Sequence, residues 1–457
     1  MHNFVIKAGG SVGERWGRVR RDHRGSPLRR SSAGSGPVTA GLRVCLVDRS
    51  RFPTEVPSTH MIHPCGVARL AELRLMEKLL ATGAPPLVRG GFVVDDVRLE
   101  MRPEMAARFE APWLCIRRII LDQLLMEAAA DAGVTVLTET PVDGLVKEEG
   151  RVRGVRSKGR ILRGRLVVGA DGPHSGVARL AGAKEYHVTP PGRVFLWAYF
   201  EGAIAPEGYA ALGRMGDLGF LGMPTDSGLY VAGIGVSADQ RDSYLSNIDA
   251  GLERGLARIG EVAEFLRPAR RVGPVRVMTR WHGYFRQATG PGWVLVGDAG
   301  HFKDPTPAQG ISDALRQGKR LAAAIESGLG AGHLDHLLRE WWNWRDNDAW
   351  EMYWFATDMG AAGDNPNIVA EMLRGLARQP NGEHRFLRVL NHDLRPSQVF
   401  TPKRALTALI RAGASRPGRL PHLARETSRL ARQKTSRQLL RRGLPTERSA
   451  PTPATAR

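Results

Sequence analysis

Short apolar runs alternate with segments of helical periodicity in the first part of the chain. Leu42–Asp48 is an apolar run that ends in an acid, a pattern typical of a buried parallel strand. In Arg118–Ala132 apolar residues recur on one helical face, Gly133 stops the pattern, and the apolar run Val134–Leu137 follows. This order of strand and helix predicts an α/β domain built on a parallel sheet.

Two later segments repeat the apolar strand and place an acidic turn behind it. Leu166–Val168 leads into Gly169-Ala170-Asp171-Gly172, where the glycines allow close approach of the backbone to a ligand. Trp293–Val296 leads into Gly297-Asp298. A helix is expected after the second turn, from about Ile311 to Leu329.

A different pattern runs from about residue 193 to residue 281. Short β-rich pieces follow one another there, with Thr225–Gly228 as a turn between two of them. We expect a mixed or antiparallel sheet that is inserted into the α/β domain and binds the substrate. The expected division is an atypical Arg-rich N-terminus (1–41), the α/β domain (42–190 and 282–330), the inserted sheet (191–281), a helical part (331–395) and a basic tail (396–457).

The net charge of +20 lies almost entirely at the two ends of the chain. Residues 1–41 carry eight basic and two acidic side chains, and residues 395–457 carry fifteen basic and two acidic ones, which leaves the centre nearly neutral. Basic tails can bind nucleic acid or an anionic membrane surface. We expect solvated tails and no specific nucleic-acid partner, with peripheral membrane contact through the C-terminal tail as the alternative.

The remaining composition favours a cytoplasmic enzyme. Hydrophobic residues make up 42% of the chain, which is enough for a large core. The apolar runs are broken before the ~18 residues of a transmembrane segment, and no apolar leader is seen at the N-terminus. The three cysteines, Cys45, Cys65 and Cys115, are odd in number and lack metal-like spacing, so we expect a reducing compartment and no metal site.

The acidic turns offer what a dinucleotide requires from a protein: pyrophosphate donors, a ribose acceptor and close backbone approach. Asp48 ends a strand where its carboxylate could accept hydrogen bonds from ribose hydroxyls, and Asp298 could accept from a polyol. The helix opened by Gln309-Gly310-Ile311, behind Pro305, could turn its N-terminal amides toward a phosphate or a flavin ring. Taken singly, each motif also fits an ordinary surface acid or a strand–turn–helix connection.

The same segments carry a specific combination of motifs. Gly169–Arg179 reads G-A-D-G-P-H-S-G-V-A-R, Gly297–Ala314 reads G-D-A-G-H-F-K-D-P-T-P-A-Q-G-I-S-D-A, and Arg118–Asp122 reads R-I-I-L-D. In this order they resemble the fingerprints of flavin-dependent monooxygenases of the p-hydroxybenzoate hydroxylase fold, which also includes geranylgeranyl reductase-like enzymes. Ser58–Pro64 resembles a segment of one bacterial subgroup. The resemblance covers about residues 42–395 and implies a Rossmann-type FAD-binding domain, an inserted substrate sheet and C-terminal helices.

The resemblance implies roles for individual residues at a bound FAD. Asp48 binds the adenosine ribose, and Arg118 contacts the pyrophosphate or ribityl region. Asp171 and Gly172 shape the site, and Asp298 holds a ribityl or pyrophosphate group. Further cofactor-binding positions are Gly297 and Val142, then Pro305, Gln309 and Gly310 along the ring, and Ile311 behind them.

The N-terminus departs from the family, which opens with a strand, a G-x-G-x-x-G loop and a helix before the strand at Leu42. Only five residues separate Gly34-Ser35-Gly36 from Leu42, whereas a crossover helix needs ~10–12 residues. Phe4–Gly13 is a second candidate, with Ala8 where the first glycine belongs. The segment that follows it, residues 14–41, holds seven arginines and shows no apolar face.

A frameshift in the gene or its record would explain this departure. Val19–Gly25 can be encoded so that the next reading frame spells Tyr-Asp-Val-Ile-Ile-Val-Gly, the missing strand and first glycine. The alternative is a natural, degenerate N-terminus. Loss of the loop removes pyrophosphate donors, so we expect weakened FAD binding or folding.

His60 and His63 are the candidates for proton transfer near the ring, because His titrates near neutrality; a structural hydrogen bond is the alternative for each. The first hypothesis for function is an FAD-dependent monooxygenase, reduced by NAD(P)H, that acts on a small aromatic or polyketide-like molecule. The cofactor then carries the chemistry and no side chain acts as a nucleophile. The alternatives are a prenyl- or geranylgeranyl-type reductase and a non-catalytic relative that lacks the flavin.

Overall fold

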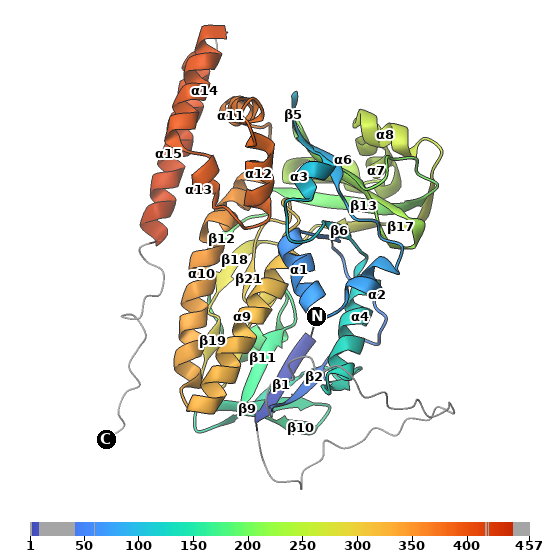
Figure 1. Ribbon diagram of the computed structural model, residues 1–457. Helices are drawn as coiled ribbons and strands as arrows, with labels where there is room; N and C mark the ends of the chain where they lie inside the picture. Colours follow the sequence, from blue (N-terminus) through green and yellow to red (C-terminus); the bar gives the residue numbers. More distant parts are fainter. Residues whose placement is uncertain (1, 9–41, 59, 416–417, 419, 442–457) are drawn as a thin grey trace.

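The computed structural model describes residues 2–8, 42–58, 60–415, 418 and 420–441. In Figure 1, a six-stranded sheet lies in the lower half, a seven-stranded sheet lies in the upper right, and the C-terminal helices stand at the upper left. The glycine-rich candidates at Gly9–Gly13 and Gly34–Gly36, and the proposed frameshift segment, lie outside the described residues.

The six-stranded sheet contains the strands expected from the apolar runs. Parallel pairs join β2 to β7 and β11 to β20. The strand order is β19 (Thr289–Gly290), β20 (Trp293–Leu295), β11 (Leu166–Ala170), β1 (His2–Ala8), β2 (Leu42–Val47) and β7 (Thr135–Leu137).

Both faces of this sheet are covered, which is why its strands are mostly apolar. On one face, Leu166 and Val168 of β11 pack in a cluster with residues of α9 (Gly310–Ala331) and α10 (Leu334–Met359). On the other face, Val167 packs with α5 (Gly176–Ala181) and with the small sheet of β8 (Gly144–Glu148), β9 (Arg151–Ser157) and β10 (Arg160–Arg163).

Strand β1 runs in the opposite direction to the rest of this sheet's core. It lies between β11 and β2 and is antiparallel to both, with His2 opposite Ala170 and Ala8 opposite Leu42. A first strand of a βαβ unit runs parallel to the second. The candidate at Phe4–Gly13 therefore forms a strand in the described residues 2–8, but that strand runs opposite to the first strand of a βαβ unit. The chain leaves β1 at the edge opposite to Asp48, so a glycine loop after Ala8 would start away from the acidic turns.

Paired cysteines can test the direction of β1. Residues directly opposite in antiparallel strands have Cα atoms ~4.5–5.5 Å apart, within the ~4.4–6.8 Å that a disulfide spans. In a Cys45→Ala background we expect Asn3→Cys to crosslink with Val47→Cys, its observed partner. The matched pair Asn3→Cys with Arg43→Cys should stay reduced, as judged by mass spectrometry of non-reduced peptides. A crosslink to position 43 instead would mean that β1 runs parallel to β2.

The seven-stranded sheet is larger than the inserted sheet expected from residues 191–281. Two of its strands, β4 and β5, come from residues 89–101, so the chain enters this sheet before residue 191. The order is β17 (Arg270–Met278), β13 (Arg193–Glu201), β16 (Tyr230–Ser237), β15 (Leu218–Pro224), β14 (Tyr209–Met215), β4 (Arg89–Val94) and β5 (Val97–Met101).

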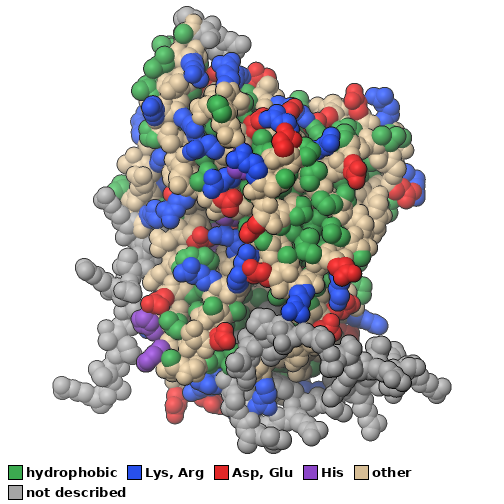
Figure 2. All heavy atoms as spheres, in the orientation of Figure 1, with side chains coloured by type: hydrophobic (Ala, Val, Ile, Leu, Met, Phe, Trp, Pro, Cys, Tyr) green, Lys and Arg blue, Asp and Glu red, His purple; other side chains and the backbone are tan. Residues whose placement is uncertain are grey.

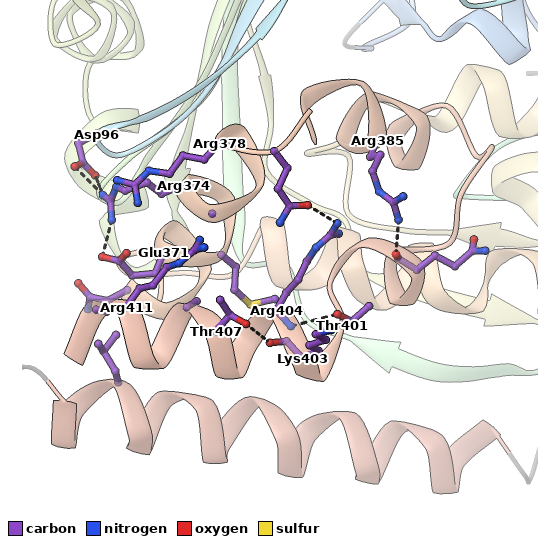
Figure 3. Close-up of a pocket in the computed structure, with 18 residues that line it drawn as sticks. Asp96, Glu371, Arg374, Arg378, Arg385, Thr401, Lys403, Arg404, Thr407 and Arg411 are labelled. Atoms are coloured by element: carbon purple, nitrogen blue, oxygen red, sulfur yellow. Dashed lines mark hydrogen bonds and ion pairs between the residues drawn. The ribbon is translucent and has the colours of Figure 1, made fainter. Parts of the chain in front are cut away.

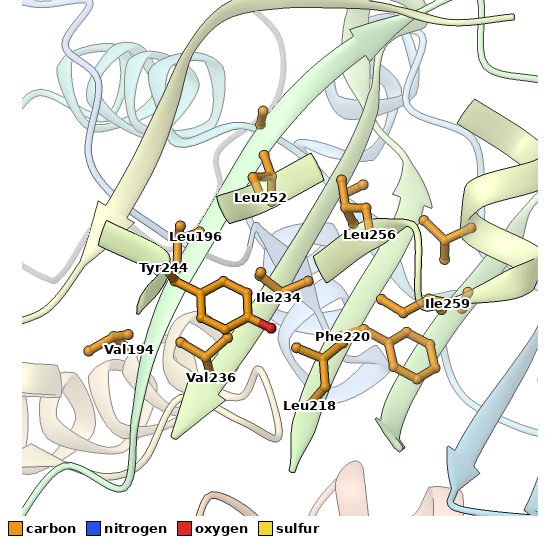
Figure 4. Close-up of a cluster of buried hydrophobic side chains, with 14 of the residues drawn as sticks. Val194, Leu196, Leu218, Phe220, Ile234, Val236, Tyr244, Leu252, Leu256 and Ile259 are labelled. Carbon is orange, nitrogen blue, oxygen red and sulfur yellow. The ribbon is translucent and has the colours of Figure 1, made fainter. Parts of the chain in front are cut away.

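One face of this sheet carries a closed apolar core. Leu252 and Leu256 of α7 (Ile248–Leu256) and Val262 of α8 (Gly260–Leu266) pack against Leu196 and Ile234 (Figure 4). The opposite face is turned toward the candidate functional site. The remaining elements are β3 (Met61–Ile62), α1 (Pro64–Glu72), α2 (Met76–Leu80), α3 (Pro103–Ala106), β6 (Leu114–Cys115), α4 (Arg118–Asp131), β12 (Glu185–Thr189), α6 (Arg241–Leu245), β18 (Gly283–Arg286) and β21 (His301–Phe302).

Residues 396–441 do not form the solvated tail that was expected. They fold into helices because small and apolar residues recur on one face: Ala408, Ala412 and Leu423 are buried against Ile368. No described helix is both long enough and apolar enough to cross a bilayer. The C-terminal helices are α11 (Asn367–Ala377), α12 (Gly382–Leu390), α13 (Pro396–Val399), α14 (Pro402–Ser415) and α15 (Leu420–Arg441).

Candidate functional site

The three acidic turns lie at one edge of the six-stranded sheet. β2 and β11 are both antiparallel to β1, and β20 is parallel to β11, so all three strands end at the same edge. Two of the turns are tied together by the Tyr284 hydroxyl, which lies 2.6 Å from the Asp298 carbonyl oxygen and 3.1 Å from that of Pro173.

A cavity of about 1650 Å3 begins at this edge and extends over the open face of the seven-stranded sheet to the C-terminal helices. It brings together most of the predicted residues: Arg118, Gly172, Gly297, Asp298, Pro305, Gly310, Ile311 and His63. Asp48, Val142, Asp171, Gln309 and His60 do not line it.

Arg118 and Asp298 give the cavity its charged end. Arg118 opens α4 and holds the buried Asp122 in a bidentate pair, with Nε–Oδ1 and Nη2–Oδ2 distances of 2.6 and 2.7 Å. Asp298 sits in a turn whose first residue, Gly297, has φ +60°. Burial raises the pKa of Asp298 to about 6, while the charge of Arg118 opposes that rise. No described donor reaches the Asp298 carboxylate, which leaves it available to a ligand.

The amino end of helix α9 lies beside this carboxylate. A Cβ added to Gly310, the first helical residue, would come within 3.9 Å of Asp298 Oδ1. Three steps further, Asp313 forms an ion pair with the buried Lys303, and His392 Nε2 lies 2.8 Å from Asp313 Oδ1. Burial alone would raise the pKa of Asp313, but the charges of Lys303 and His392 outweigh it and hold that pKa well below its ordinary value.

Asp48 and Asp171 serve their own turns in the structure. Asp48 is buried and accepts a hydrogen bond from the Ser50 amide at 2.6 Å. Asp171 accepts from the Val177 amide at 3.1 Å and from the Ser175 hydroxyl, so it caps α5. Neither carboxylate lines the cavity that contains Asp298, and each accepts hydrogen bonds from its own turn. Their contact with FAD stays a prediction.

Two other expected cofactor positions also differ. Gln309 does not line the cavity, and its side-chain amide nitrogen donates to the Leu390 carbonyl at 2.7 Å. Its backbone still forms the start of α9. Val142 packs in the apolar cluster around Val155 beneath the six-stranded sheet.

The histidines are placed by structural hydrogen bonds. His63 Nδ1 accepts from Trp113 Nε1 at 3.1 Å, and Nε2 lies 2.9 Å from the Pro307 carbonyl, so both ring nitrogens are occupied. His60 Nε2 lies 2.6 Å from the Tyr199 hydroxyl. Burial lowers the pKa of His60 to about 3 and that of His63 to about 4, which keeps both neutral near pH 7. The structural hydrogen bond weighed as the alternative is present for each, and a role in proton transfer stays a prediction.

Sequence reasoning missed the buried ion pairs around the cavity. Asp226 is fully buried and binds Arg117 through the backbone amide at 2.7 Å and through the guanidinium, with Nη2 2.6 Å from Oδ1. This pair fixes the start of α4, directly before Arg118. Lys303 offered a signal, since it is the one Lys or Arg of the segment Gly297–Ala314, which also holds three aspartates. His392 offered none, because it reaches Asp313 from a distant helix end.

The described residues fit only part of FAD. The half-buried Asp298 carboxylate without a described donor, Arg118, and the amino end of α9 suit the ribityl and ring end. Gly172, with φ +75°, allows close backbone approach. A glycine loop for the pyrophosphate is not among the described residues, and the amino end of β1 lies between β2 and β11 where that loop would begin.

Comparison with known proteins agrees with this site. The sequence matches the FAD binding domain family over residues 33–340, more than half of the chain. It is 28% identical over 311 residues to 6-methylpretetramide 4-monooxygenase of Streptomyces rimosus, covering 64% of this chain and 71% of that protein. It is also 28% identical over 254 residues to digeranylgeranylglycerophospholipid reductase 2 of Methanococcoides burtonii, covering 51% of this chain and 57% of that protein.

The solved structures show the same fold. The myxobacterial chondrochloren halogenase CndH superposes with a TM-score of 0.63 at 21% identity, over 79% of this chain and 94% of that chain. The expected fold class, a Rossmann-type FAD-binding domain with an inserted sheet and C-terminal helices, is thus confirmed. The chain belongs to the FAD binding domain family and is an FAD-dependent oxidoreductase of the monooxygenase type.

Proposed function

We propose that the protein is an NAD(P)H-dependent monooxygenase that acts on a small aromatic or polyketide-like molecule. One observation carries this proposal: a single cavity joins the Arg118–Asp298 end to the open face of the seven-stranded sheet. That arrangement would allow an organic molecule to bind beside the ring end of a flavin.

The walls of the cavity suit an apolar substrate. Its sheet side is lined by apolar and aromatic side chains, among them Phe92, Phe195, Trp197, Leu212, Leu221 and Met223. Ligand sites are predominantly apolar with a few placed polar groups, and this cavity has both parts. The similarity to a 6-methylpretetramide 4-monooxygenase supports the aromatic class.

The chain's own residues would bind and orient the cofactor. Arg118 would donate to the pyrophosphate or ribityl region, and Asp298 would accept from the ribityl hydroxyls. The amide groups at the start of α9 would face the ring, where the helix dipole favours negative charge. FAD would supply the redox and oxygen-activating chemistry, while the protein supplies position and electrostatics. Asp48 remains the proposed ribose contact, because the Ser50 amide takes only one of the about four acceptor positions of a carboxylate.

The cellular setting is also a proposal. Cys45, Cys65 and Cys115 are buried free thiols, and burial raises the pKa of each to about 12. Thiols kept reduced are typical of the cytoplasm, where NAD(P)H is available.

The proposal predicts a yellow protein with flavin absorbance after purification of the full chain. With NADPH and a substrate present, reductant oxidation should depend on molecular oxygen. A colourless protein that takes up no added FAD would contradict the proposal. It would agree instead with a relative that keeps the fold without the flavin.

A prenyl-type reductase is the second candidate, favoured by the length of the cavity. The lining continues past the sheet to Leu409 of α14 and Leu430 of α15, which suits a long apolar chain. In that case NADPH oxidation would proceed without oxygen and depend on a substrate with a reducible double bond.

A further inference from the structure

A second cavity, of about 570 Å3, lies among the C-terminal helices α11, α12, α13 and α14 (Figure 3). Its size is within the ~300–1,000 Å3 range of small-molecule sites. Asn367, Met372 and Thr401 line both this cavity and the larger one. On the molecular surface, Lys and Arg side chains gather over this helical part (Figure 2).

Basic side chains dominate the lining. They are Arg374, Arg378, Arg385, Lys403, Arg404 and Arg411. Both acids of the lining form ion pairs with Arg374, whose guanidinium lies 2.8 Å from Asp96 and 2.5 Å from Glu371. In the part of the chain that the structure describes, the other five basic side chains of the lining form no ion pair with a carboxylate. The cavity therefore carries positive charge that the described protein does not compensate.

Neutral oxygens hold two of these cations in place. Arg404 donates to the Val399 carbonyl at 2.6 Å and to the Gln379 side-chain oxygen at 2.9 Å. Arg385 donates to the Gln398 carbonyl at 3.0 Å, while its Nε is buried without a described acceptor. Burial and the charge of Arg385 both lower the pKa of Arg404. Neutral acceptors fix a guanidinium without cancelling its charge.

We propose that this cavity binds the phosphate groups of a phosphorylated small molecule. The planar guanidinium fork matches phosphate oxygens in bidentate geometry, and a lysine adds a point charge. The basic residues lie on or beside α11, α12 and α14, along a cavity that is larger than one phosphate group. This spacing favours a pyrophosphate or a longer phosphate chain. None of the six basic residues lines the larger cavity, so the proposal does not depend on the flavin site.

Calorimetric titration of the full-length, FAD-supplemented protein with inorganic pyrophosphate, at constant ionic strength, tests this site. The side chains of Arg378 and Lys403 have no described hydrogen bond, so Arg378→Gln and Lys403→Gln should leave the fold intact. Each should weaken pyrophosphate binding about tenfold, the typical worth of one charge-assisted hydrogen bond. The matched control is Arg432→Gln, exposed on α15 outside both cavities, which should bind as the wild type does.

Three outcomes would overturn the proposal. The first is wild-type affinity in both cavity variants with a loss in Arg118→Gln, which would place pyrophosphate at the flavin site. The second is tighter binding of citrate than of pyrophosphate, which would indicate a carboxylate ligand. The third is no binding of pyrophosphate or tripolyphosphate at millimolar concentration. Because the cavity variants do not touch the flavin site, failure here leaves the proposed flavin function standing, and the reverse also holds.

Discussion

Replacing Asp313 by Asn is expected to lower the free energy of unfolding by about 3–5 kcal/mol, the usual cost of removing one partner of a buried ion pair. The ammonium of Lys303 is 7% exposed and forms an ion pair with this carboxylate. Without the Asp313 carboxylate, the buried Lys303 ammonium would face only the polar lining of the cavity. Chemical denaturation monitored by tryptophan fluorescence would measure the change.

The acid dependence of stability should change in the same variant. Because the pKa of Asp313 is held below its ordinary 3.8, its ionised form stabilises the fold above pH 3.8, and that contribution is lost as the pH falls through the lowered value. Asp313→Asn should lack this loss. The double variant Lys303→Met with Asp313→Leu is the control, because removing both charges should recover most of the stability. A single variant as stable as the wild type would show that the pair contributes nothing.

Replacing Arg118 by Gln is expected to weaken FAD binding by about tenfold to a hundredfold, since a charge-assisted hydrogen bond is worth roughly 1.5–3 kcal/mol. Arg118 is the first residue of helix α4 and lines the same cavity as Asp298. Its charge also lowers the pKa of Asp298, so the variant should raise that pKa above about 6. Fluorescence titration with FAD across pH 5–8 would show both effects: weaker binding, and an acid-side loss of affinity that begins at higher pH.

Asp122→Asn separates this effect from damage to helix α4. It removes the carboxylate that Arg118 holds but keeps the guanidinium beside the cavity. We expect a stability loss with FAD affinity reduced by less than in Arg118→Gln. Equal loss of affinity in both variants would mean that Arg118 acts only through the packing of α4.

Local sequence patterns are sufficient to predict the family and the secondary structure around the site. Apolar runs that lead into an acidic turn predict β2, β11 and β20 in the right order, because a strand buried on both faces has little choice of residue types. The helical face of Arg118–Ala132 places Arg118 at the start of α4. The turn motifs therefore locate the charged end of the cavity from the amino-acid sequence alone.

Which side chains face the cavity depends instead on how the elements pack. Asp48 and Asp171 carry the expected motifs, yet nearby amides and a hydroxyl take their carboxylates. His392 reaches Asp313 from a distant part of the chain, and residues 89–101 join a sheet made mostly of later strands. The direction of β1 is also set at this level, since a short apolar strand can pair in either direction and only its neighbours select one. Local patterns specify conformation, whereas partners distant in sequence are chosen by tertiary packing.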